Sequence, residues 1–279
     1  MDALRQIDAW PSATAAVAVV SAAGTVAAHG PQEQAFRWAS VTKLATALAT
    51  LVAVEEGSVD LDQPAGPPGA TLRHLLAHAA GYSFDEVTLL AEPGLRRIYS
   101  NVGIEAAAAV VEEAAGMPFG DYLRAAVLDP LGLRAELRGS PAHGLHGPVS
   151  DLALLGRELL APTLVARETL DEATAVAFSG LSGVLPLFGR QEPCDWGLGF
   201  EIRAGKSPHW TGSSNSPRTF GHFGGSGSFL WVDPEAGVAL ACLTDLDAGP
   251  WIREAWPTLA DAVLAELEEL PLAAPSAAG

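Results

Sequence analysis

The sequence predicts an α+β fold, in which an antiparallel β-sheet is built from both ends of the chain and a mostly helical lobe is inserted between them. Short apolar runs rich in β-branched residues near both ends predict strands, whereas apolar residues in the middle recur with helical periodicity. Strands from the two ends share one sheet most simply when the helical segment packs beside it. We therefore expect a sheet lobe flanked by helices from residues 1–57 and 185–279, a helical lobe from 58–184, and a cleft between them.

The first elements follow from runs and breaks in composition. Residues 13–20 and 25–29 are expected to form a hairpin, because Ala23-Gly24 separates two apolar runs. Residues 40–56 then change to Leu, Ala and Thr without Gly or Pro, and Gly57 ends this run. The largely apolar composition predicts a buried helix.

Further helices fill the middle of the chain, and strands return after them. Helical patterns lie near residues 71–79, 102–115, 119–127, 150–160 and 167–177. Strands are expected at 197–203, 227–232 and 237–244, with a turn at 233–237 before the last one. A final helix is expected at about 252–269, and the Ala/Pro/Ser/Gly tail from Pro271 is expected to be disordered.

Charge and composition exclude several kinds of partner. The formal net charge of −17 disfavours a nucleic acid or an anionic membrane, since either requires a basic patch. The first residues lack a basic segment followed by an apolar core, and the apolar stretch near 15–20 is too short to span a bilayer. We therefore expect a cytoplasmic protein. Cys194 and Cys242 have no metal-ligand spacing, so free thiols are expected.

The tetrapeptide Ser40-Val41-Thr42-Lys43 opens the apolar helix and carries the strongest chemical signal. Residues three apart on a helix share a face, so the Lys43 amine can reach the Ser40 oxygen. A serine hydroxyl becomes a good nucleophile when a base takes its proton, and a lysine is such a base only when its amine is neutral. Burial and the positive end of the helix dipole both favour the neutral amine. Alone, this Ser-x-x-Lys pattern also fits an exposed helix cap followed by a solvated lysine.

An ordered series of motifs surrounds this tetrapeptide. They are residues 38–43, residues 71–81, Pro93-Gly94 leading into Tyr99-Ser100-Asn101, and Gly221-His222-Phe223-Gly224-Gly225 just before the strand expected at 227–232, with further landmarks at 116–119, 129–133, 150–153 and 196–200. Over residues 13–250, this order resembles the serine β-lactamase and penicillin-binding-protein superfamily. The resemblance is closest to its class C β-lactamase-related esterase and D-aminopeptidase branch, and it implies a β-lactamase/transpeptidase-like fold.

The resemblance implies a role for each matching residue. Ser40 would be the nucleophile, Lys43 the base or its partner, and Tyr99 would share proton transfer with the leaving group. Asn101 would bind the acyl substrate's carbonyl or amide, and the backbone N–H groups of Ser40 and Gly225 would form the oxyanion hole. A phenol beside a lysine ammonium can have a lowered pKa, which leaves the choice of base open. Without such a role, Asn101 would be a helix N-cap.

The third motif begins with His222, followed by Phe223 and Gly224, where many members of the superfamily have lysine. A fixed cation favours a substrate carboxylate, whereas a histidine is mostly neutral at pH 7. A histidine variant occurs in esterase-like and aminopeptidase-like relatives. We therefore expect an acyl-enzyme on Ser40 formed from a small ester or amide, without metal or cofactor. His222 could instead be a satisfied structural histidine.

A metallohydrolase is the first competing hypothesis. His74 and His78 stand four residues apart, a spacing that can bind zinc. The glutamate of His-Glu-x-x-His is missing, and His143 and His146 in a Gly/Pro loop are the nearest candidates for a third ligand.

The remaining hypotheses concern other kinds of serine chemistry. An α/β-hydrolase is disfavoured because no Gly-x-Ser-x-Gly elbow occurs, and Ser226 is expected to serve a turn. A β-lactamase, a D-alanyl-D-alanine carboxypeptidase or D-aminopeptidase, an acyltransferase and a non-catalytic acyl-trapping sensor remain open. The segment 204–218 is a candidate rim of the cleft.

Overall fold

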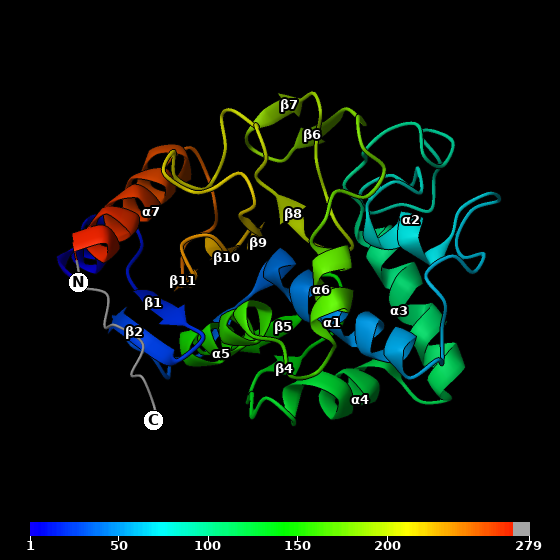
Figure 1. Cartoon of the computed structure of the whole chain (residues 1–279), viewed down its shortest axis with the longest axis horizontal. Coiled ribbons are helices and arrows are strands. Elements are labelled where there is room, and N and C mark those ends of the chain that lie inside the picture. Colours follow the sequence, from blue (N-terminus) through cyan, green and yellow to red (C-terminus); the bar gives the residue numbers. More distant parts are fainter. Residues whose placement is uncertain (270–279) are drawn as a thin grey trace, which may run out of the picture.

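The computed structural model describes residues 1–269, and its centre is a six-stranded antiparallel sheet in the order β2-β1-β11-β10-β9-β8 (Figure 1). The strands are β1 (Ala15–Ser21), β2 (Gly24–His29), β8 (Glu201–Ile202), β9 (Phe220–Gly224), β10 (Ser228–Asp233) and β11 (Val238–Thr244). Strand β1 pairs with β11 along its whole length. The expected α+β fold with a sheet from both ends of the chain is confirmed. The expected disorder from Pro271 lies outside the described residues.

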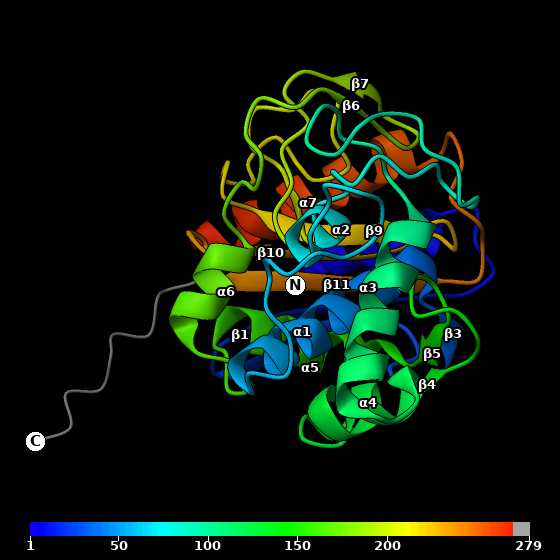
Figure 2. The same cartoon turned by 90° about the vertical axis from the view of Figure 1, so that its right-hand side faces the viewer.

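The helices and smaller strands complete the described fold. The helices are η1 (Asp2–Ala9), η2 (Ala39–Val41), α1 (Thr42–Glu55), α2 (Leu72–Leu76), α3 (Asn101–Ala115), α4 (Phe119–Leu123), the π-helical turn η3 (Arg124–Leu128), α5 (Val149–Leu160), α6 (Arg167–Ala173) and α7 (Ile252–Glu269). A small sheet contains β3 (Phe36–Arg37), β5 (Leu145–Gly147) and β4 (Glu136–Leu137), and β6 (Gly183–Leu185) pairs with β7 (Gly189–Gln191). Helices α2, α3 and α4 lie together, away from α7 (Figure 1), and α3 and α4 face the viewer in Figure 2.

Both faces of the large sheet are buried, and alternate residues of a strand belong to the cores on opposite faces. On β1, Ala16, Ala18 and Val20 belong to the cluster that includes α1 and α5, whereas Val17 and Val19 belong to the cluster that includes η1 and α7. Successive side chains of a strand point to opposite faces, so the near-continuous apolar sequence of β1 follows from burial on both sides.

Helix α1 is buried on nearly every face and connects the sheet with the other helices. All residues from 42 to 51 are buried, and α1 contacts α3, α4 and β9. A helix that is apolar all round belongs in a protein interior. The predicted buried helix is confirmed, with its first residues forming the 3₁₀ turn η2.

The strand expected at 197–203 is much shorter than predicted. Only Glu201–Ile202 pairs with β9. Gly199 has φ of +87°, and a Cβ there would lie 2.3 Å from Ala47 Cβ. The chain therefore turns beside α1 at this point, and residue periodicity does not reveal that close approach.

The third motif lies just before β10, as expected, and its residues 221–224 themselves belong to β9. The division into lobes 1–57 with 185–279 and 58–184 stays a prediction. Helix α5 comes from the segment 58–184 and packs against β1, β10 and β11.

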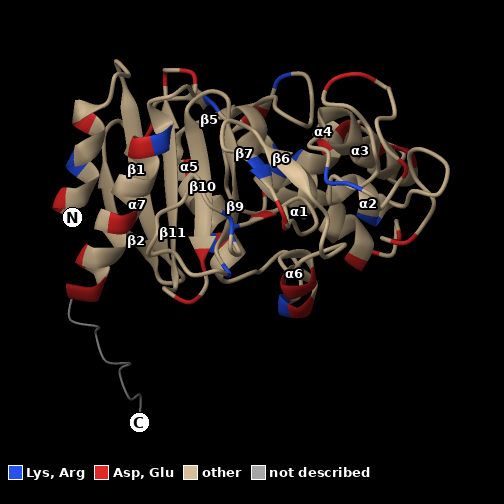
Figure 3. Cartoon of the chain, turned by 90° about the horizontal axis from the view of Figure 1, so that it is seen from above, with Lys and Arg blue, Asp and Glu red and all other residues tan. Residues whose placement is uncertain are grey.

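Acidic residues recur on the outer helices α6 and α7 (Figure 3). Among the helices of residues 1–269, none is long and apolar enough to cross a membrane.

The side chain of Arg97, two residues before Tyr99, links several loops by hydrogen bonds. Its guanidinium is buried and donates to the carbonyl oxygens of Ala77 at 2.5 Å, Ala177 at 2.7 Å and Cys194 at 3.1 Å. Burial lowers the pKa of Arg97 to about 10, so the group stays protonated at neutral pH. These bonds fix the loops that carry Tyr99 and, after Cys194, Trp196.

We expect Arg97→Met to lower the free energy of unfolding by about 3 kcal/mol, because it leaves several buried carbonyl oxygens without a donor. Urea denaturation measures this loss. The matched control is Arg96→Met, whose side chain is exposed, and its change should stay within about 0.5 kcal/mol. Equal losses for the two variants would contradict the structural role of Arg97.

Candidate active site

Ser40 lies in the turn η2, where the chain enters helix α1. The preceding residue, Ala39, has φ of +45°, a left-handed conformation that residues with a Cβ rarely adopt. The turn is held by neighbouring strands: the Ser228 hydroxyl donates to the Trp38 carbonyl at 2.8 Å, and Trp38 N–H donates to the Leu145 carbonyl at 2.9 Å. These contacts hold the backbone around Ser40 despite the strain at Ala39.

Lys43 lies one turn further on α1, and its side chain is completely buried. Its Nζ donates to Ser40 Oγ at 3.3 Å, to Asn101 Oδ1 at 2.6 Å and to the Ala142 carbonyl at 2.9 Å. The contact between Ser40 and Lys43 that the spacing predicts is therefore present. The amine is held on all sides by acceptors.

The pKa of Lys43 is set by opposing effects. Burial lowers it to about 7, and the negative charges of Glu105 and Asp85 act in the opposite direction. Because desolvation disfavours the ammonium form, a large fraction of Lys43 is neutral near pH 7. The amine can therefore accept a proton from a neighbouring hydroxyl.

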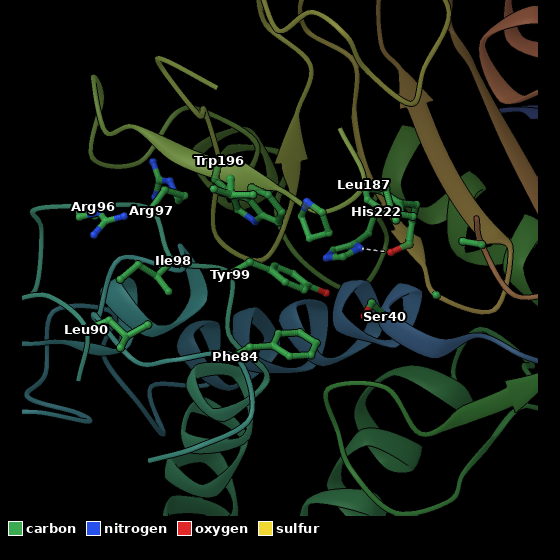
Figure 4. A pocket seen from close by; sticks show the side chains of 15 residues that line it. Ser40, Phe84, Leu90, Arg96, Arg97, Ile98, Tyr99, Leu187, Trp196 and His222 are labelled. Atoms are coloured by element: carbon green, nitrogen blue, oxygen red, sulfur yellow. Dashed lines mark hydrogen bonds between the residues drawn. The ribbon is translucent and has the colours of Figure 1, made fainter. Parts of the chain in front are cut away.

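Tyr99 closes over this pair from the segment before α3. Its ring centroid lies 4.9 Å from Lys43 Nζ, and its hydroxyl points toward Ser40 (Figure 4). The ring is surrounded by His78 at 4.8 Å, His222 at 5.6 Å and Trp196 at 5.9 Å between ring centroids. The three predicted side chains Ser40, Lys43 and Tyr99 thus meet at one place.

The pKa of Tyr99 is raised, although a phenol beside a lysine ammonium can have a lowered one. Burial among aromatic rings is the main cause, and the interaction with the Ser40 hydroxyl lowers the pKa by less. The phenol therefore keeps its proton at neutral pH. Of the two candidate bases, Lys43 is the one that can be unprotonated.

Asn101, the first residue of α3, is held by charged neighbours. Its Oδ1 accepts from Lys43, and its Nδ2 donates to Asp85 Oδ1 at 2.7 Å. The N-cap of α3 is Ser100, whose hydroxyl accepts from Gly103 N–H, so the N-cap interpretation of Asn101 is wrong. Asn101 links Asp85 to the Lys43 amine.

His222 on β9 is buried and neutral. Its Nδ1–H donates to the Phe223 carbonyl at 2.6 Å, so Nε2 carries the lone pair. Burial lowers the pKa of His222 to about 3, and the charge of Lys43 adds to this effect. Among the described residues, Nε2 has no hydrogen-bond partner. A satisfied structural histidine would have both ring nitrogens engaged, and this one does not.

Gly224 and Gly225 bring β9 against the Ser40 turn. A Cβ on Gly224 would lie 2.4 Å from Ser228 Oγ and 2.6 Å from the Trp38 carbonyl, so only glycine fits there. No hydrogen bond within residues 1–269 uses the N–H group of Ser40 or Gly225 as a donor. Both residues line the same cavity, as an oxyanion hole requires.

The cavity beside Ser40 has a volume of about 660 Å³. Figure 4 shows Tyr99, Trp196 and His222 around its inner end, next to Ser40. The segment 204–218, the candidate rim of the cleft, contributes no residue to this cavity. Its Trp210 is buried and donates to Glu201 at 2.9 Å. The rim comes from other loops.

The two histidines of the zinc hypothesis have separate structural tasks. His74 Nδ1 lies 2.9 Å from the Thr71 hydroxyl, and its ring packs on Phe178 at 4.2 Å between centroids. His78 Nδ1 accepts from Ser100 N–H at 3.2 Å, and its Nε2, like that of His222, has no hydrogen-bond partner among the described residues, although its ring packs against Tyr99 and Trp196. In the part of the chain that the structure describes, no group of three His, Cys, Asp or Glu side chains could hold a metal ion.

Several residues of the site escaped sequence reasoning. Asp85, Glu105 and the Ala142 carbonyl surround the Lys43–Asn101 pair, but no local pattern marks a loop acid or a carbonyl as a neighbour of a distant lysine. Ser226 was expected only to serve a turn, and its hydroxyl also donates to the Arg37 carbonyl at 2.7 Å. Trp196 belongs to the sequence landmark at 196–200, but the landmark alone does not indicate that it lines the cavity.

Comparison with known proteins agrees with this geometry. The profile of the family described as Beta-lactamase matches residues 11–137 and 134–265. The crystal structure of a beta-lactamase from Mycobacterium bovis has a TM-score of 0.94 and 52% sequence identity, covering 95% of this chain and 99% of that one. EstCE1, a hydrolase with promiscuous acyltransferase activity, has a TM-score of 0.78 at 19% identity, covering 94% and 97% of the two chains, which shows a shared fold.

A curated relative matches a smaller part. Penicillin-binding protein 4* of Bacillus subtilis (strain 168) is 28% identical over 189 residues, which are 53% of this chain and 40% of that protein. The match therefore spans less than half the length of this relative.

We expect Gly224→Ala to destabilise the protein by about 1–3 kcal/mol, because the added methyl group overlaps Ser228 Oγ and the Trp38 carbonyl. Urea denaturation measures this loss. The control is Gly225→Ala, whose added Cβ would meet no atom within 4 Å, so its stability should not change. A fully stable Gly224→Ala protein would contradict the close packing.

Proposed function

This chain belongs to the beta-lactamase family of serine hydrolases, and we propose that it cleaves carboxylic esters or amides through an acyl-enzyme on Ser40. The observation that carries the proposal is the buried Lys43 amine, which has a pKa of about 7 and contacts Ser40 Oγ at the end of a substrate-sized cavity. A neutral amine next to a serine hydroxyl is what an activated nucleophile requires.

In acylation, Ser40 Oγ forms a bond to the substrate carbonyl carbon and its proton passes to Lys43 Nζ. The negative charge on the carbonyl oxygen is stabilised by the N–H groups of Ser40 and Gly225. The Tyr99 hydroxyl gives its proton to the leaving oxygen or nitrogen as the carbon–heteroatom bond breaks. Tyr99 then regains a proton from the Lys43 ammonium, so the pair returns to its starting state. The raised pKa of Tyr99 suits this donor role.

In deacylation, water takes the place of the leaving group. Lys43 accepts a proton from water as the water oxygen attacks the acyl carbon, and the Lys43 ammonium then gives this proton to Ser40 Oγ as the bond between Oγ and the acyl carbon breaks. Asn101 keeps the amine aimed at Ser40, since its own orientation is fixed by Asp85. Both half-reactions use Ser40 and Lys43, and Tyr99 acts when the first leaving group departs.

His222 favours an ester or amide without a carboxylate beside the scissile bond. A lysine at this position would offer a fixed cation, whereas the buried His222 is neutral with a free Nε2 lone pair. A substrate carboxylate would gain no ion pair there, and it would lose its water. We therefore rank ester and amide hydrolysis above breakdown of β-lactams.

The test compares p-nitrophenyl butyrate with a chromogenic cephalosporin. We expect ester turnover that Ser40→Ala reduces by at least about 10⁴-fold and Lys43→Ala by nearly as much, because nucleophile and base act as a unit. A fluorophosphonate probe should add its mass to the wild-type protein and not to Ser40→Ala. Rapid cephalosporin turnover without ester turnover would reverse the ranking, and a persistent adduct without turnover of either would indicate a sensor.

The pH dependence of kcat/KM should follow the protonation of Lys43. The lowered pKa means that the amine is neutral above about pH 7, so kcat/KM should rise about tenfold per pH unit below this value and level off above it. His222 titrates near pH 3 and Tyr99 far above neutrality, so neither produces an inflection between pH 5 and 9. A flat profile over this range, with the protein folded by circular dichroism, would exclude Lys43 as the base.

A further inference from the structure

The cavity beside Ser40 has apolar walls along most of its length. Besides Tyr99, the rings of Phe84, Trp196 and Phe223 line it, and aliphatic side chains such as Ile98 continue the surface. The buried guanidinium of Arg97 is occupied by carbonyl oxygens, so it does not offer a charge to a ligand. Ligand sites with this composition bind mainly by apolar contact, with few polar groups for orientation.

The mouth of this cavity also exposes large apolar side chains. Phe84 and Leu90 are 49% and 57% exposed on the loop after α2, and Val184 and Leu187 are 59% and 41% exposed on the β6–β7 hairpin. The two segments meet through the pairing of Arg97 with Gly183. Apolar side chains gathered around an opening indicate a binding surface, whereas single ones on a surface do not.

The polar groups at the inner end are neutral. His222 is uncharged and directs a lone pair from Nε2, and Trp196 Nε1–H has no acceptor among the described residues. The charged Arg96 lies at the exposed mouth. An uncharged ester group therefore matches the inner end, and an apolar chain matches the walls that lead outward.

We propose that the substrate of Ser40 is an uncharged ester with an extended apolar group, of the size of an octanoyl or octyl chain, which fills the cavity between the loop after α2 and the β6–β7 hairpin. The inference rests on the proposed serine hydrolase function and adds the substrate class. Each methylene group that moves from water onto an apolar wall can raise kcat/KM by up to about fourfold. The apolar chain can belong to the acid or to the alcohol.

The experiment measures kcat/KM for p-nitrophenyl acetate, butyrate and octanoate below their micellar concentrations, and for ethyl and octyl acetate by acid release. At least a tenfold rise from acetate to octanoate supports an acyl chain in the cavity, and the same rise from ethyl to octyl acetate supports an alkyl chain. Turnover of the short esters with no rise in either series overturns the inference and leaves the serine hydrolase function intact. No turnover of any ester overturns the inference, and failure of the fluorophosphonate probe to add its mass at Ser40 would overturn the serine hydrolase function as well.

Two variants test whether these walls determine the preference for long-chain over short-chain esters. Leu90→Ser and Val184→Ser remove one exposed apolar side chain from each side of the mouth, and each should lower the ratio between long-chain and short-chain kcat/KM at least threefold. The matched control is Val26→Ser on β2, which is 40% exposed and does not line the cavity, and its ratio should not change. Unchanged ratios in both wall variants, or a change only in their oligomeric state by sedimentation, would overturn the inference.

Discussion

The site depends on the burial of one amine. Lys43 can be neutral near pH 7 because helix α1 runs through the interior and is covered on nearly every face. Full burial without partners would lower its pKa much further, and the nearby carboxylates of Asp85 and Glu105 oppose this. The pKa of about 7 is therefore a balance between a dry environment and two acids placed at its edge. Asn101 connects the amine to one of these acids, since its side chain is hydrogen-bonded to both Lys43 and Asp85.

A second constraint is the close approach of β9 to the Ser40 turn. Gly224 has no side chain, so the strand can touch Trp38 and Ala39, and this contact places His222 and Gly225 on the cavity of Ser40. The left-handed conformation of Ala39 persists because the turn is bonded to β10 and β5 on either side. The strained backbone at Ala39 and the close packing at Gly224 thus belong to one contact between the Ser40 turn and β9.

The sequence predicted the parts of this arrangement that depend on local pattern. The buried helix, the reach of Lys43 to Ser40 and the sheet built from both ends follow from periodicity and spacing. The rim of the cavity did not follow: it comes from the loop after α2 and from β6–β7, and the segment 204–218 packs elsewhere through Trp210. Loop sequences have no regular periodicity from which their packing partners could be predicted. The raised pKa of Tyr99 could not be predicted for a related reason, because it depends on burial by rings that distant segments contribute.

The same burial explains the charge states of three different groups. Desolvation favours the neutral form of any side chain, so it removes a proton from Lys43 and His222 and retains one on Tyr99. A fixed cation in place of His222 would repel the Lys43 ammonium and would also bring a charge into the apolar cavity. With a neutral histidine, the site keeps one titrating base near neutrality, one protonated phenol and one uncharged acceptor. In the proposed reaction, recognition at the inner end depends on shape and apolar contact, and the chemistry depends on a single proton that moves between Ser40, Lys43 and Tyr99.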